Sequence, residues 1–193
     1  MPRLLLAMIA GLLLFSAGLS QAQLPAQNGQ YKVPGGSKVV LSSVGTQGES
    51  RVEFFNPSGK RLCTADYTSA DGSHGYYVAK AEWTPDKHFF VFSLESSGGH
   101  SVMNTPTQFF SLREQSLCSL DSYVGGYGIE FADFGLRSPN TVEVRVNAID
   151  APVRVSLSSL ATKAPSSEHG CVPCKAGAVH IFGDRTPYQH SPN

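Results

Sequence analysis

One stretch of the chain, residues 80–93, holds the only tryptophan and the densest run of large apolar residues outside the N-terminus. Pro85 supplies the φ that the second position of a type I turn requires, and Asp86 can close a hydrogen bond onto its own backbone. We therefore expect two strands joined by a turn at residues 84–87. Alternate side chains of a strand point to opposite faces, and in the second strand both sets are apolar. This pattern predicts a central strand that is covered on both faces and forms the heart of the core.

Similar patterns of strand, turn and strand lie on both sides of this hairpin. In residues 141–147 valine alternates with polar residues, which predicts a strand with one wet face at the outside of the sheet system. No stretch beyond the N-terminus has the spacing of an amphipathic helix. The predicted strands are residues 38–41, 51–55, 60–67, 76–83, 89–94, 108–112, 116–120, 141–147 and 153–157. The predicted fold class is all-β, with antiparallel hairpins in a propeller-blade-like or sandwich arrangement and a flexible C-terminal tail.

The composition divides the chain into four segments. Residues 1–22 have an early cation, an apolar run and small residues before a cleavage point after Ala22, which is typical of a secretory signal peptide. The apolar run is shorter than the roughly 20 residues of a membrane-spanning helix, which argues against an uncleaved anchor. Residues 23–37 predict a flexible leader, residues 38–160 a β-domain, and residues 161–193 a tail rich in Pro, Gly, Ser and His. We expect a periplasmic or secreted protein with no membrane association after cleavage.

Charge and motifs narrow the classes of function. The formal net charge is zero and no basic run occurs, so we expect no nucleic-acid partner. Signatures of nucleophilic hydrolases, zinc proteases and phosphate-binding loops are missing from the sequence. We expect a non-catalytic module without a cofactor that binds a protein, a peptide or an envelope glycan. One alternative is a hydrolase, whose candidate converging carboxylates are Asp66, Asp71, Glu82 and Glu95.

The central hairpin also carries a resemblance. Residues 82–93, Glu-Trp-Thr-Pro-Asp-Lys-His-Phe-Phe-Val-Phe-Ser, resemble the Trp-Ser-Pro-Asp-Gly-Lys hairpin of bacterial TolB-like β-propeller repeats, with Lys87 where that pattern has glycine. The resemblance covers about a dozen residues. It implies a blade-like hairpin in which the Pro85-Asp86 pair shapes the turn, and it implies no catalytic residue.

Four cysteines in an exported chain predict disulfides, for which three pairings are possible. Cys63 and Cys118 fall in predicted strands of separate hairpins and have apolar neighbours. We therefore predict a Cys63–Cys118 bond that joins the two hairpins.

The tail carries the other two cysteines, in the sequence Glu-His-Gly-Cys-Val-Pro-Cys. A local Cys171–Cys174 disulfide is the expectation, and links to the other two cysteines are an alternative. Two thiolates and two imidazoles, from His169, Cys171, Cys174 and His180, would alternatively bind zinc or copper, and a reactive thiol pair would exchange disulfides. Because the tail has few apolar residues, we expect it to be dispensable for folding. The alternative is that residues 179–182 add a strand to the domain.

Overall fold

The computed structural model describes residues 28–98, 106–124, 129, 133–146, 149–161, 170–175 and 177–181. Nearly all regular structure in these residues is β-strand, which confirms the predicted all-β class. The predicted signal peptide lies outside the described residues. The strands are β1 (Gly29–Lys32), β2 (Lys38–Val44), β3 (Glu49–Phe55), β4 (Arg61–Asp66), β5 (Tyr76–Trp83), β6 (Phe89–Ser96), β7 (Thr107–Ser111), β8 (Ser116–Ser119), β9 (Gly135–Arg137), β10 (Thr141–Val144), β11 (Val153–Ser156), β12 (Cys171–Pro173) and β13 (Ala178–Ile181). A 3-10 turn, η1 (Asp121–Tyr123), and a short helix, α1 (Leu157–Ala161), complete the described elements.

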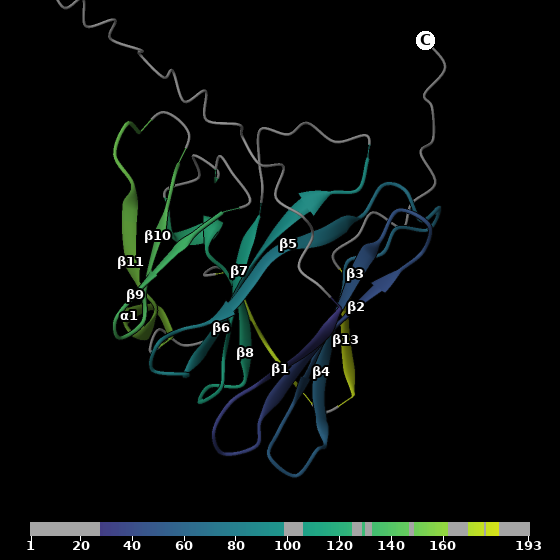
Figure 1. Ribbon diagram of the computed structural model, residues 1–193, viewed down its shortest axis with the longest axis horizontal. Helices are drawn as coiled ribbons and strands as arrows, with labels where there is room; N and C mark the ends of the chain where they lie inside the picture. Colours follow the sequence, from purple (N-terminus) through teal and green to yellow (C-terminus); the bar gives the residue numbers. More distant parts are fainter. Residues whose placement is uncertain are drawn as a thin grey trace, which may run out of the picture.

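The strands form three sheets, which Figure 1 shows in succession across the molecule. The first sheet has the order β1-β2-β3-β4-β13, the middle sheet β12-β8-β7-β6-β5, and the small sheet β11-β10-β9. Neighbouring strands pair antiparallel except β13, which runs parallel to β4. No described helix is long and apolar enough to cross a membrane.

The middle sheet has a hydrophobic core on each face. Phe90, Phe92 and Leu94 of β6 belong to a first core, which the middle sheet shares with the first sheet. Phe89 and Val91 belong to a second core, which is shared with the small sheet and α1. All five side chains are buried, and burying each contributes about 1.5–3 kcal/mol relative to exposure. The prediction that this strand is covered on both faces is confirmed.

The turn between β5 and β6 also follows the prediction. The Asp86 carboxylate accepts hydrogen bonds from Thr84 Oγ1 at 2.6 Å and from the His88 amide at 3.1 Å. Lys87 has a φ of 61°, the left-handed region in which glycine is strain-free. Asp86 therefore shapes the turn, and its second oxygen accepts a hydrogen bond from Asn140 Nδ2 at 2.7 Å, which ties the turn to the residues before β10.

The flexible leader predicted for residues 23–37 is wrong for the part that forms β1. This strand pairs with β2 at the edge of the first sheet. The Tyr31 ring meets Phe90 edge-on, with centroids 5.2 Å apart, and the Tyr31 carbonyl accepts a hydrogen bond from the half-buried Trp83 indole at 3.1 Å. Backbone pairing and one aromatic contact hold the segment, and neither leaves an apolar periodicity in the sequence.

The flexible tail predicted from residue 161 is also wrong for the segment that the structure describes. β12 pairs with β8 at one edge of the middle sheet, and β13 pairs with β4 at one edge of the first sheet. The alternative of an added strand near residues 179–182 is confirmed by β13. The C-terminal segment is thus part of two sheets, so it is expected to contribute to folding.

Candidate functional site

The four cysteines form two disulfides, Cys63–Cys174 and Cys118–Cys171. The predicted Cys63–Cys118 bond is therefore wrong, and so is the local Cys171–Cys174 bond. The alternative of links from the tail to the two earlier cysteines is the one that the structure shows. All four side chains are buried.

Side-chain alternation along β8 explains why the predicted bond does not form. Leu117 points into the first core, so the next residue, Cys118, points into the second core. Cys63 of β4 lies in the first core. The two cysteines are consequently on opposite sides of the middle sheet and cannot meet. The alternation was visible in the sequence, but the sequence did not show which face of β8 would meet the first sheet.

The C-terminal segment crosses from one core to the other. Cys171 stands opposite Cys118 in the β12–β8 pairing, and their bond lies in the second core. Beyond the end of β12, the Cys174 amide donates a hydrogen bond to the Gln115 carbonyl at 2.7 Å, and the Cys174 side chain enters the first core to bond Cys63. Four residues of chain thus link the cores on both faces of the middle sheet.

The proposed zinc or copper ligands are not brought together as a ligand set. Zinc and copper bind thiolates, but Cys171 and Cys174 are both in disulfides. His169 and the side chain of His180 lie outside what the structure describes. Among the described side chains, no group of three or more His, Cys, Asp or Glu could hold a metal ion.

The four carboxylates of the hydrolase alternative have different partners. Asp66 accepts a hydrogen bond from the Arg51 guanidinium at 3.0 Å, and Glu95 accepts one from the Tyr77 hydroxyl at 2.5 Å. Glu82 is exposed, with an oxygen 3.6 Å from Lys80 Nζ. Asp71, in the loop after β4, contacts the side chains of its own loop. These contacts give no opposed pair of carboxyl groups of the kind that an acid–base mechanism needs.

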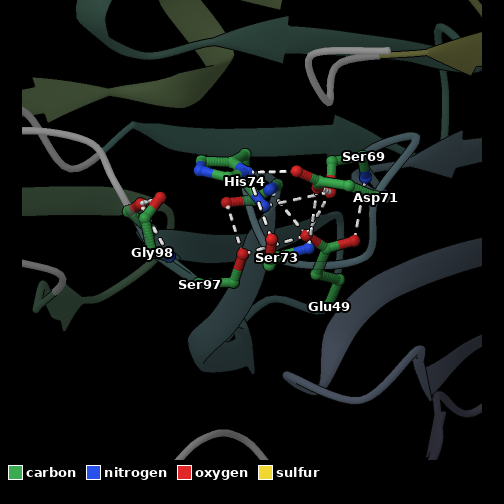
Figure 2. A network of polar contacts seen from close by, with 9 residues as sticks. Glu49, Ser69, Asp71, Ser73, His74, Ser97 and Gly98 are labelled. Atoms are coloured by element: carbon green, nitrogen blue, oxygen red, sulfur yellow. Dashed lines mark hydrogen bonds and ion pairs between the residues drawn. The ribbon is translucent and has the colours of Figure 1, made fainter. Parts of the chain in front are cut away.

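A buried carboxylate that the sequence analysis missed, Glu49 at the start of β3, organises this loop (Figure 2). It accepts hydrogen bonds from the Ser69 amide and hydroxyl at 2.8 and 2.6 Å, from the Gly75 amide at 2.6 Å, and from the Ser97 hydroxyl at 2.9 Å. Burial raises the pKa of Glu49, but these hydrogen bonds outweigh it and the net pKa is lowered. The carboxylate therefore stays ionised and fixes the loop to the ends of β3 and β6.

The same loop contains serine, histidine and aspartate, but their geometry differs from a catalytic triad. His74 Nδ1 contacts both the Asp71 carboxylate and, at 3.1 Å, the Ser73 hydroxyl (Figure 2). A triad needs the carboxylate on one ring nitrogen and the nucleophile on the other. The Ser69 hydroxyl lies between the carboxylates of Glu49 and Asp71, at 2.6 and 2.9 Å. The network therefore holds a loop together.

The described surface has an open groove of about 710 Å³ between β5 and the small sheet. Lys80 of β5 reaches across the groove, where its Nζ donates hydrogen bonds to Asp133 Oδ1 and to the Phe134 carbonyl, both at 2.7 Å. The same Nζ lies 4.9 Å from the centre of the Phe134 ring. Gly135, at the start of the edge strand β9, also lines the groove. The groove is therefore built on strands of two sheets.

Among the described side chains that line the groove, the charges are paired with one exception. The Glu143 carboxylate lies 2.9 Å from Arg154 Nε and 3.7 Å from Arg137 Nε, and the hydrogen bond from Arg154 and the charges of both arginines lower its pKa. Lys80 lies near Asp133. Arg145, which is exposed and follows β10, forms no ion pair within the part of the chain that the structure describes. Arg145 is thus the charge of the groove that no described acid pairs.

Sequence reasoning did not find the groove because its residues come from four separate segments. The alternation of residues 141–147 does place Arg145 on the wet face of its strand, but it does not indicate what lies opposite. The TolB-like resemblance remains a prediction. Comparison with protein-family models, curated proteins and solved structures found no match to this chain.

Proposed function

We propose that this chain is a non-catalytic binding module of the periplasm or the extracellular space, and that its groove holds a peptide segment with an acidic side chain. The two disulfides indicate an oxidising, extracytoplasmic environment. The observation that carries the proposal is the groove, whose volume falls within the roughly 300–1,000 Å³ range of ligand sites.

The charge of the groove supports an acidic ligand. Asp133 and Glu143 are held by cations of the protein, so neither is available to a basic ligand without loss of an ion pair. Arg145 has no such partner among the described residues, and a guanidinium offers parallel N–H groups that match a carboxylate. One carboxylate of a ligand could pair with it there.

The walls of the groove favour a peptide over a glycan. Phe134 is buried, and the Lys80 ammonium stands over its ring, so this ring offers no open face for a sugar to stack on. Gly135 belongs to β9, and an edge strand presents main-chain donors and acceptors with which an extended peptide pairs. A peptide therefore matches both the backbone edge and the cation.

A display library of random hexapeptides, selected on the oxidised protein, tests this proposal. We expect enrichment of peptides with Asp or Glu, and we expect Arg145→Gln to weaken their binding at least about tenfold, since hydrogen bonds to charged groups contribute about 1.5–3 kcal/mol. Arg113→Gln is the matched control, because it removes the same charge from an 89% exposed side chain on another hairpin. The proposal fails if acidic peptides are not enriched, or if both variants bind them as the wild type does. Binding of an acidic glycan in place of peptides would also contradict it.

A further inference from the structure

The order of the cysteines along the chain differs from the order in which they pair. Cys63, the first, bonds Cys174, the last, and the two between them bond each other. A chain that enters an oxidising compartment from its N-terminus presents Cys63 and Cys118 there before the other two cysteines arrive. The first disulfide available to the chain is therefore a non-native one.

Loop closure favours the non-native Cys63–Cys118 bond over the native outer bond. The native outer bond closes a separation of 111 residues, whereas Cys63 and Cys118 are roughly half as far apart. Halving a flexible loop lowers its closure free energy by about 0.6 kcal/mol. Cys171 and Cys174 are closer still. The native inner pair, Cys118 and Cys171, is separated by 53 residues, so loop length does not favour Cys63 with Cys118 over this pair. The order of emergence therefore favours Cys63 with Cys118, and the short tail loop favours Cys171 with Cys174.

The consecutive pairing cannot persist in the native fold. Cys63 belongs to the first core and Cys118 to the second, so a bond between them would have to pass through the middle sheet. Once the sheets have closed, all four sulfur-bearing side chains are at most 5% exposed, and an external thiol cannot reach them. The wrong disulfides therefore have to be exchanged for the native ones before the chain has folded completely.

We infer that this protein is a client of a thiol–disulfide isomerase, an enzyme with a reactive thiolate that acts on the misbonded chain. The enzyme thiolate attacks the Cys63–Cys118 bond, forms a mixed disulfide with Cys118 and releases Cys63 as a thiolate. The Cys63 thiolate attacks Cys174 in the Cys171–Cys174 bond and releases the Cys171 thiolate. The latter attacks Cys118 and expels the enzyme thiolate. Two disulfides are present before and after, so the sequence consumes no oxidant. This inference does not depend on the groove.

Oxidative refolding of the reduced chain, residues 23–193, with and without a catalytic amount of a disulfide isomerase tests the inference. Trypsin cleaves beside Lys and Arg, so peptide 62–80 carries Cys63, peptide 114–137 carries Cys118, and peptide 164–175 carries both tail cysteines. We expect the uncatalysed reaction to accumulate peptide 62–80 bonded to 114–137, with 164–175 separate. We expect the isomerase to speed native pairing at least about tenfold, a ratio equivalent to about 1.4 kcal/mol of barrier.

The Cys63→Ala/Cys174→Ala variant is the matched control. It can form only the Cys118–Cys171 bond, so it has no wrong bond to correct, and bond formation can be measured whether or not the variant folds. The isomerase should leave its rate within about twofold of the uncatalysed rate. The inference is overturned if the wild type reaches native pairing without the 62–80/114–137 species, or if the isomerase accelerates the wild type and the variant equally.

Discussion

Loss of the Cys63–Cys174 bond should destabilise the whole domain, because this bond joins β4 of the first sheet to the segment that leaves the middle sheet. The chain-entropy relation gives about 4.7 kcal/mol for a loop of roughly 100 residues. With Cys118–Cys171 intact, that inner bond shortens the path around the outer loop to roughly half, which lowers the value to about 4 kcal/mol. We expect a decrease of about 3–4 kcal/mol in the free energy of unfolding, or a Tm lower by roughly 10 °C.

The assay compares oxidised and reduced forms of a Cys118→Ala/Cys171→Ala variant by denaturant unfolding. This variant lacks the inner bond, so the whole loop counts and the expected difference is about 4.7 kcal/mol. Both forms keep the two sulfur atoms of Cys63 and Cys174, so the difference between them reports the cross-link and not the packing of the side chains. A difference of less than about 1 kcal/mol, with the bond shown to be intact in the oxidised form, would refute the argument that this bond constrains a long loop.

Two further predictions concern the loop around Glu49. The pKa of Glu49 is lower in the folded protein than in the unfolded chain, so its contribution to stability is complete above about pH 4.5 and is lost as the pH falls through the lower folded value. Glu49→Gln should cost about 2–3 kcal/mol at pH 7, because the amide nitrogen of glutamine would face hydrogen-bond donors. It should also flatten the loss of stability below about pH 4.5 in denaturant titrations, and an unchanged acid profile would contradict this. Gly75→Ala should cost about 3 kcal/mol, since its Cβ would lie 2.2 Å from the Tyr67 carbonyl oxygen and 2.7 Å from Glu49 Oε1. Gly72→Ala is the control, because a Cβ there would meet no atom within 4 Å and only the positive φ should cost about 1 kcal/mol. Equal melting temperatures for the two variants would show that crowding at Gly75 does not decide the stability.

The hairpins of the middle sheet were predictable because their information is local. Pro85 and Asp86 specify a turn, and the apolar residues of β6 specify burial on both faces. Strands β10 and β11 of the small sheet were predictable for the same reason, since Val142 and Val144 point inward and Glu143 points outward, whereas β9 was not predicted. Alternation within one strand and the residues of one turn decide these elements, whatever the distant parts of the chain do.

The pairing of the cysteines was not predictable in this way because it depends on how the layers stack. The sequence places Cys118 opposite to Leu117, but only the assembled sheets decide which of the two meets β4. β12 and β13 are held by backbone pairing and disulfides, so their few apolar residues gave no signal for β12 and only the alternative of an added strand for β13. The groove depends on the same stacking, since it lies between β5 of the middle sheet and the small sheet.

The central claim is that the C-terminal segment bonds to cysteines on both sides of the middle sheet. Non-reducing tryptic mapping of the oxidised protein, prepared at low pH to prevent thiol exchange, tests it directly. We predict that peptides 62–80, 114–137 and 164–175 are joined in one cluster, with fragmentation between Cys171 and Cys174 assigning Cys171 to Cys118 and Cys174 to Cys63. Peptide 62–80 bonded to 114–137 alone, with 164–175 carrying its own internal bond, would contradict the account.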